Sequence, residues 1–330
     1  MAKAADQAEQ RAEEFRKDFD RLVDEVGKVI VGYRDIVSSV LTCLLCDGHA
    51  LLEGVPGVGK TLLVNTLATC LNLDFSRVQF TPDLMPADVT GTTILIEDKH
   101  GSRSLQFQKG PIFANVVLAD EINRSTPKTQ SALLEAMQEQ SVTSGTTTYK
   151  LEPPFIVLAT QNPLEMEGTY PLPEAQLDRF LFKLLFPFPS ADELALILDR
   201  TTSVEMPTAD RIMGADELLA MRRTVREVPV ADHVRDYAIR LVLNTRPELD
   251  GAPESTKQYI RYGSSPRGAQ ALMLGGKVRA LLDGRFALSR EDMDAVAHQA
   301  LRHRMVLNFE GEAAGMNTDD LVDEILKKTK

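Results

Sequence analysis

The feature that most constrains the fold is a glycine-rich stretch that reads Gly54-Val55-Pro56-Gly57-Val58-Gly59-Lys60-Thr61. It matches G-x-x-x-x-G-K-[ST] and lies between an apolar run, 49–53, and a helix-like segment, 61–71. That context is what a phosphate-binding loop requires, because backbone N–H groups and a helix N-terminus then surround the phosphates. Lys60 would neutralise the phosphate oxygens of ATP, and the Thr61 hydroxyl would bind Mg²⁺. The predicted nucleotide-binding residues of this segment are Gly54, Val55, Pro56, Gly57, Val58, Gly59, Lys60, Thr61 and Leu62.

Polar side chains follow two of the later apolar runs. Asp120 and Glu121 end the run 115–119, and Asn162 follows the run 155–160. Ligands of open parallel sheets bind at the carboxyl ends of the strands, so these side chains are expected beside the phosphates. We predict that Asp120 holds Mg²⁺ and that Glu121 polarises the attacking water. The Asn162 amide can both donate and accept, and it is predicted to hold that water and report the γ-phosphate.

The alternation of short apolar runs with helical patterns sets the fold class. Strand-length runs separated by crossover helices indicate a parallel sheet covered on both faces, whereas helical periodicity dominates after the proline-bearing stretch 186–190. We predict an α/β P-loop core with a parallel five-stranded sheet and helices on both faces, followed by a small all-helical lid. The predicted divisions are a charged N-terminal helix (1–25), the core (26–189) and the lid (190–330).

The N-terminal helix carries an apolar stripe. Phe15, Phe19, Leu22 and Val26 fall at spacings of four, three and four, which places them on one face of a helix. The stripe could be a seam for a partner helix. The favoured interpretation is a helix that lies against its own domain.

Composition narrows the partners and the compartment. The formal net charge of −11 disfavours nucleic acid as the main partner, because surplus carboxylates repel phosphate backbones. No apolar run approaches the ~20 residues that cross a bilayer, and the first residues carry no hydrophobic segment of the signal-peptide kind. The protein is therefore expected to be cytoplasmic and to have no membrane span.

Three cysteines, Cys43, Cys46 and Cys70, are too few and too unevenly numbered for a disulfide scaffold. Cys43 and Cys46 form a C-x-x-C pair, but a metal site would need two more ligands. The flanking apolar residues favour buried thiols on a helix face.

In order and spacing, these motifs resemble those of the MoxR family of AAA+ ATPases. The segments that carry the resemblance are 120–124, 128–137, 168–180, 263–267 and 301–304. The resemblance covers roughly residues 25 to 309 and implies a helix-2 insert AAA+ protein that hydrolyses ATP with Mg²⁺.

The resemblance also implies roles that the bare sequence does not reveal. Arg179 matches the arginine finger that enters a neighbouring subunit's site, and Arg267 matches the second sensor, the lid's contact to nucleotide. Val31 and Gly32 lie where related ATPases contact adenine, although Tyr33 stands where a glutamine is common. A site that needs a neighbour's arginine implies a homo-oligomer, expected to be a hexameric ring.

Two inserts are implied, near 82–108 and 140–151, and Gly145 lies in the second. Such loops face the axis of the ring and touch a client protein. The family suggests chaperone-like remodelling or maturation of that client, together with a partner that has a von Willebrand factor A domain.

Three other functions remain open at this stage. A magnesium-chelatase-like subunit or a DNA-acting motor shares the helix-2 insert architecture, and the acidic charge argues against the motor. A P-loop phosphotransferase is a further alternative, although Glu121 beside Asp120 suits water as the acceptor.

Overall fold

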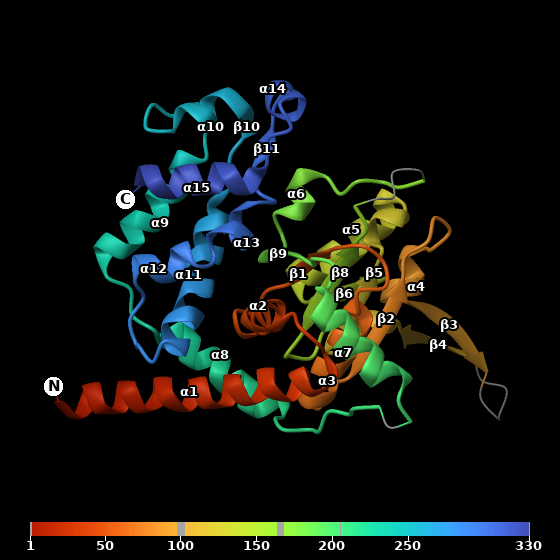
Figure 1. The fold of residues 1–330 in the computed structure, drawn as a ribbon. Helices are drawn as coiled ribbons and strands as arrows, with labels where there is room; N and C mark the ends of the chain where they lie inside the picture. Colours follow the sequence, from red (N-terminus) through yellow and green to blue (C-terminus); the bar gives the residue numbers. More distant parts are fainter. Residues whose placement is uncertain (1, 98–102, 164–167, 205, 330) are drawn as a thin grey trace.

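The computed structural model describes residues 2–97, 103–163, 168–204 and 206–329. An α/β core, a long N-terminal helix and a helical C-terminal region can be followed along the chain in Figure 1. Part of the first predicted insert, 98–102, lies outside the described residues.

A parallel five-stranded sheet forms the centre of the core. The strand order is β2-β5-β8-β1-β9, and every neighbouring pair is parallel. This confirms the predicted sheet. The strands are β1 (Ala50–Glu53), β2 (Phe75–Gln79), β5 (Val116–Asp120), β8 (Ile156–Gln161) and β9 (Phe182–Leu185).

Both faces of the sheet are buried, which explains why the central strands read as continuous apolar runs. Val116 and Leu118 of β5 belong to one hydrophobic cluster, whereas Val117 and Ala119 belong to another on the opposite face. The first cluster includes side chains of α2 (Arg34–Leu45) and α3 (Lys60–Cys70), and the second includes α5 (Pro127–Glu139). Apolar side chains that point alternately to the two faces of each strand thus let helices pack on both faces of the sheet.

Two antiparallel hairpins extend from the core. The first follows α4 (Pro86–Thr90) and pairs β3 (Gly91–Glu97) with β4 (Arg103–Lys109); the second pairs β6 (Ser141–Ser144) with β7 (Thr147–Lys150). The strands of the second hairpin lie within the predicted range 140–151, and those of the first lie within 82–108 except that β4 extends one residue further, to Lys109. The rings of Phe107 and Tyr149 stack with centroids 4.3 Å apart, so the two hairpins contact each other. The first hairpin projects away from the molecule (Figure 1).

Helix α1 (Ala2–Val29) runs along both the core and the C-terminal region (Figure 1). Its stripe of Phe15, Phe19, Leu22 and Val26 is buried in the same cluster as residues of α3 and of two C-terminal helices, α8 (Ala215–Glu227) and α11 (Pro266–Leu282). The stripe therefore packs within its own chain, and the helix continues to Val29.

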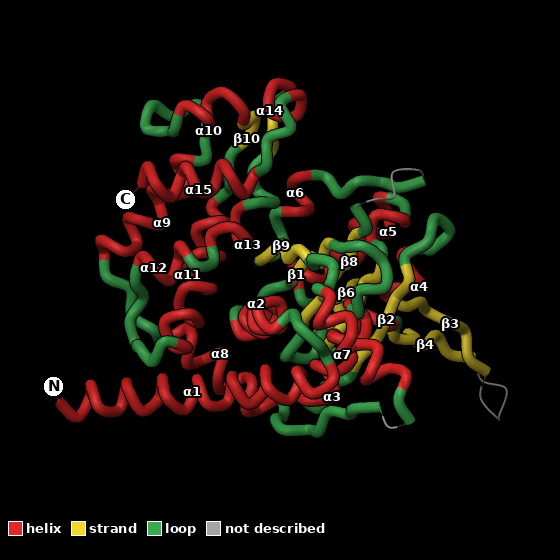
Figure 2. The backbone as a smooth tube through the Cα atoms, viewed as in Figure 1, coloured by secondary structure: helices red, strands yellow, loops and turns green. Residues whose placement is uncertain are grey.

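The C-terminal region consists mainly of helices, as the red tube in Figure 2 shows. It also has a short antiparallel pair, β10 (Ile260–Tyr262) with β11 (Val306–Leu307). A Cβ atom on Gly275 of α11 would lie 2.7 Å from the Phe182 ring, so this glycine permits close packing of the helix on β9. The remaining helices are η1 (Pro111–Phe113), η2 (Ile122–Arg124), α6 (Glu174–Leu177), α7 (Ala191–Thr202), α8 (Ala215–Glu227), α9 (Asp232–Asn244), α10 (Glu254–Tyr259), α11 (Pro266–Leu282), α12 (Arg290–Asp294), α13 (Ala297–Leu301), α14 (Phe309–Ala313) and α15 (Thr318–Thr329).

Of the helices in the described parts of the chain, none combines the length and the apolar character needed to cross a membrane.

Candidate functional site

The glycine-rich loop joins β1 to α3 and has a backbone that suits phosphate binding. Gly57 and Gly59 have φ of 85° and 89°, a left-handed conformation that glycine adopts without steric cost. The Lys60 ammonium donates a 2.6 Å hydrogen bond to the carbonyl oxygen of Gly54. Burial lowers the pKa of Lys60, and the carboxylates of Asp120, Glu121 and Glu53 act in the opposite direction.

The loop opens into a cavity of about 400 Å³, which the predicted phosphate and Mg²⁺ ligands Lys60, Thr61 and Asp120 share with two of the four predicted catalytic residues, Glu121 and Asn162. Asp120 and Glu121 reach it from the end of β5, and Asn162 reaches it from the end of the neighbouring strand β8. The lining residues are Pro56, Gly57, Gly59, Lys60, Thr61, Leu62, Arg77, Gln79, Asp120, Glu121, Thr160 and Asn162. We call this the P-loop cavity.

Hydrogen bonds fix the Asp120 carboxylate. One oxygen accepts a 2.7 Å bond from the Thr160 hydroxyl, and the other accepts from Nε and Nη2 of Arg77 at 3.0 and 2.6 Å. Thr61 and Asp120 both offer oxygen atoms to the cavity that contains Lys60. Mg²⁺ in nucleotide sites takes one or two protein oxygens together with phosphates and water, so these residues fit that ion.

Glu121 has a constrained backbone and a held carboxylate. Its φ is 55°, an uncommon value for a residue with a side chain, and its N–H donates to the Thr160 hydroxyl at 2.8 Å. Its Oε2 atom accepts from Gln79 Nε2 at 2.8 Å and from Arg124 Nη1 at 2.9 Å. The carboxylate is therefore oriented at the edge of the cavity where a phosphate would bind.

A second, apolar cavity of about 310 Å³ adjoins the P-loop cavity and shares Pro56, Gly57, Gly59 and Leu62 with it. Val31 lines this cavity, as do Val58 and Tyr33, and it is the natural place for a nucleotide base. Gly32, which follows Val31, has a φ of 68°.

Helix α7 forms the other wall of this apolar cavity, which we call the base cavity, through Leu194 and Ile197. Arg200 of this helix donates to the carbonyl oxygens of Gly27 and Lys28 at 3.1 and 2.7 Å, which ties α7 to the end of α1. These residues cannot be recognised from the sequence, because they lie more than a hundred positions from the loop that they face.

The two predicted arginines, Arg179 and Arg267, lie in the same cavity as each other, and this cavity is not the P-loop cavity. Arg179 and Arg267 both line a cavity of about 560 Å³, which also contains Arg226, Lys277 and Arg304. Neither Arg179 nor Arg267 is among the described residues that line the P-loop cavity. We call this second place the arginine cavity.

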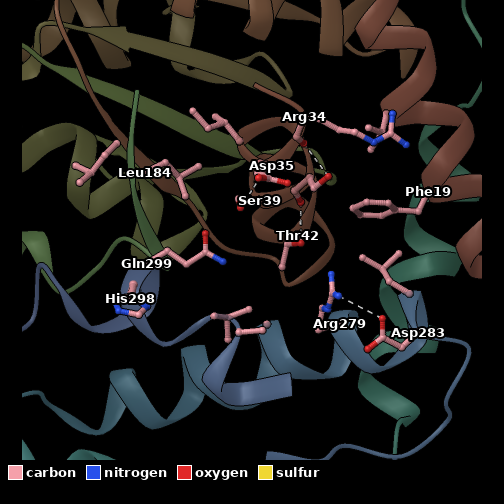
Figure 3. Close-up of a pocket in the computed structure, with 18 of the residues that line it drawn as sticks. Phe19, Arg34, Asp35, Ser39, Thr42, Leu184, Arg279, Asp283, His298 and Gln299 are labelled. Atoms are coloured by element: carbon pink, nitrogen blue, oxygen red, sulfur yellow. Dashed lines mark hydrogen bonds and ion pairs between the residues drawn. The ribbon is translucent and has the colours of Figure 1, made fainter. Parts of the chain in front are cut away.

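A further cavity, of about 580 Å³, lies between α1, α2, β9 and helices of the C-terminal region (Figure 3). Its arginines are engaged within the chain: Arg279 pairs with Asp283 at 3.4 Å, and Arg302 pairs with Asp319 at 2.9 Å. None of the predicted site residues, all of which the structure describes, lines this cavity.

Comparison with known proteins identifies the family. The sequence model described as "ATPase family associated with various cellular activities (AAA)" matches residues 49–182, and the "AAA lid domain" matches residues 253–325. Chaperone MoxR1 of Mycobacterium tuberculosis is 41% identical over 93% of this chain and 81% of its own length. Protein MoxR of Paracoccus denitrificans is 30% identical, covering 85% of this chain and 86% of its own.

This chain belongs to the MoxR family of AAA+ ATPases. It is also similar to YeaC of Bacillus subtilis, with 44% identity over 94% of this chain and 93% of that protein. A solved structure from Cytophaga hutchinsonii superimposes with a TM-score of 0.90 at 42% identity, covering 98% of this chain and 97% of that chain. The fold and the ATPase activity predicted from the sequence are thus confirmed.

Among the residues in the P-loop cavity of this MoxR-family protein that sequence reasoning missed are Arg77 and Gln79 of β2. They contact Asp120 and Glu121, respectively. The available signal was their spacing of two, which puts both polar side chains on one face of a strand. Nothing local in the sequence indicates that β2 lies beside β5.

Proposed function

We propose that this ATPase works as a homo-oligomeric ring, a hexamer, in which Arg179 and Arg267 of one subunit act on ATP held by the P-loop of the next. The observation that carries the proposal is that both arginines line a cavity separate from the P-loop cavity. A finger residue that cannot serve its own site can serve a neighbour's, and repeated head-to-tail contacts close into a ring.

Within each site, the roles follow from the contacts of the side chains. Lys60 and the loop N–H groups bind the phosphates, and Thr61 and Asp120 hold Mg²⁺, which supplies charge that neutralises the transferred phosphoryl group. Glu121, held by Gln79 and Arg124, accepts a proton from the attacking water. Asn162 lines the same cavity and orients that water. Val31, Tyr33 and the α7 residues line the cavity proposed for the base, and Gly32 lies between Val31 and Tyr33 in the chain.

We further propose that the cycle remodels a client protein. The name of Chaperone MoxR1, 41% identical to this chain, supports a chaperone-like role. The two contacting hairpins support it as well, because Leu95 and Leu105 face each other across β3 and β4 and are 61% and 75% exposed. Exposed apolar residues on a projecting element are suited to protein contact. A partner with a von Willebrand factor A domain remains part of the proposal from family resemblance alone.

Mixing two inactive variants tests the shared site. Lys60→Ala removes the phosphate-binding charge but keeps the arginines, and Arg179→Ala keeps the P-loop but removes the finger. Each variant alone should lose turnover, by about 10³-fold or more for the finger. Mixed rings should recover activity, because some interfaces pair an intact P-loop with an intact arginine. Absence of any recovery in rings shown to be mixed would contradict the proposal.

A further inference from the structure

We propose that Asp178 is a positioning residue that fixes Arg179 of the core and Arg267 of the lid as one unit for presentation to the neighbouring subunit. This inference rests on the proposed function, in which both arginines act across the subunit interface. Its basis is a set of contacts that converge on one carboxylate between the core and the C-terminal helices.

Three groups of the C-terminal region converge on the Asp178 carboxylate. The Ser265 hydroxyl lies 2.9 and 2.8 Å from its two oxygens, Arg304 Nε donates to Oδ1 at 3.0 Å, and Arg267 Nη1 lies 3.5 Å from Oδ2. The Asp178 side chain is only 18% exposed. Charge-assisted hydrogen bonds of this kind are stronger than neutral ones, so the carboxylate joins the two parts of the chain firmly.

Arg304 fixes the backbone on both sides of Arg179. Its Nη2 atom donates to the carbonyl oxygen of Asp178 at 3.1 Å and to that of Phe180 at 2.6 Å. Its Nη1 atom donates to the carbonyl oxygen of Leu181 at 3.0 Å. The Arg304 side chain is 2% exposed, and a buried cation needs its counter-charge. Asp178 supplies that charge and thereby keeps the backbone clamp in place.

On the lid side, Asp178 acts through Ser265. The same hydroxyl that contacts the carboxylate accepts a 3.1 Å bond from the N–H of Arg267 and caps α11. Asp178 therefore determines where the helix that carries Arg267 begins relative to Arg179.

The two lid arginines that contact Asp178 differ in how freely their side chains can move. Arg304 is buried, whereas the Arg267 side chain is 41% exposed and its 3.5 Å contact with Asp178 is long for a hydrogen bond. Arg267 can exchange this weak contact for a phosphate oxygen while Arg304 stays in place. Asp178 thus holds the side chain of Arg304 in place and leaves the side chain of Arg267 available to a phosphate.

The test is the same mixing experiment with Lys60→Ala, in which the second variant is Asp178→Asn in place of Arg179→Ala. Asp178→Asn keeps the size of the side chain but removes its charge. Rings of this variant alone should bind ATP within about threefold of wild type and lose at least about tenfold in turnover, because a positioning error of the finger acts on the neighbour's site. In rings formed from equal amounts of this variant and Lys60→Ala, about a quarter of the interfaces pair an intact P-loop with a neighbour that retains Asp178. Turnover of the mixed rings should therefore recover to about a quarter of the wild-type value.

Two further variants keep the test decisive. Asp319→Asn is the matched control: it removes a part-buried carboxylate paired with Arg302, outside the arginine cavity, and should leave turnover within about twofold. Ser265→Ala removes the hydroxyl that contacts Asp178 but keeps the pairing of Asp178 with Arg304. It is the variant to measure if Asp178→Asn fails to fold. It should show a smaller loss of turnover that mixing with Lys60→Ala also repairs.

The outcomes separate the two proposals. Recovery with Arg179→Ala but not with Asp178→Asn or Ser265→Ala would overturn the role of Asp178 and leave the shared site standing. No recovery with Arg179→Ala would overturn the shared site itself. Recovery with all three variants, with Asp319→Asn unaffected, is the expected result.

Discussion

The P-loop cavity and the arginine cavity are built in different ways. The P-loop cavity takes most of its groups from one loop and from the ends of two adjacent strands, β5 and β8. The arginine cavity gathers residues from segments as distant as 46–49, 178–181, 226, 267–277 and 304. The first can be recognised from a local pattern, whereas the second exists only once the C-terminal helices pack on the core.

The difference suggests a division of labour between the cavities. Under the proposed function, groups that bind the phosphates and activate water lie in the first, and groups that complete a neighbour's site lie in the second. Variants in each cavity should therefore fail in different ways.

Glu121→Gln should separate binding from hydrolysis within the P-loop cavity. The substitution removes the proton acceptor but keeps the shape of the side chain, so turnover should fall by about 10²–10⁴-fold. ATP affinity should stay close to wild type, because Lys60 and the loop are unchanged. Turnover and equilibrium nucleotide binding, measured on the same preparation, check this. Unchanged turnover would show that Glu121 does not activate water.

Acid should lower the stability of the fold at the arginine cavity, because the buried His49 lies in the wall of that cavity. The His49 Nδ1 atom accepts a 2.9 Å bond from the N–H of Val157, and Nε2 lies 3.2 Å from the carbonyl oxygen of Met137. Burial lowers the pKa of His49 to about 4, below the unfolded value near 6.5. The unfolded state then binds more protons, so the stabilisation present above pH ~6.5 is lost as pH falls towards ~4, roughly 3 kcal/mol in all.

Urea unfolding of the wild type and of His49→Gln between pH 4 and 8 measures this effect. The variant should be less stable at neutral pH but should lose less stability on acidification. Equal pH dependence in the two proteins would contradict the assignment to His49.

Gln79→Ala should give the smallest effect. It removes one of the two side chains that hold the Glu121 carboxylate, and a hydrogen bond of this type contributes about 1 kcal/mol, or roughly fivefold in turnover. ATP affinity should not change. Gln106→Ala on β4, outside the P-loop cavity, is the control, and steady-state turnover of both variants is the measurement. An equal loss in the control would contradict a specific role for Gln79.

Features of the fold and the site that depend on local sequence could be predicted, whereas those that depend on tertiary packing could not. The loop 54–61, the strand that ends at Asp120 and the alternation of strands with helices depend on local rules, and those predictions of fold and activity are confirmed. Arg77 and Gln79 were missed because their importance depends on the pairing of β2 with β5. Leu194 and Ile197 were missed because α7 reaches the base cavity only through tertiary packing.

The arginines represent an intermediate case. Arg179 and Arg267 were found by family resemblance, which gave their identity but not their position relative to the P-loop. Their shared cavity and their common contact with Asp178 depend on long-range packing of residues 265–267 and 304 on the core.

A site shared between subunits is tested by ATP turnover per subunit as a function of protein concentration, with sizing of the same samples and with Arg179→Ala in parallel. A site completed by a neighbour predicts that specific activity rises as rings form, and that the variant assembles but remains slow. Turnover that does not depend on protein concentration and does not change in Arg179→Ala would mean that one chain contains the complete site, and no residue of a neighbour would be needed.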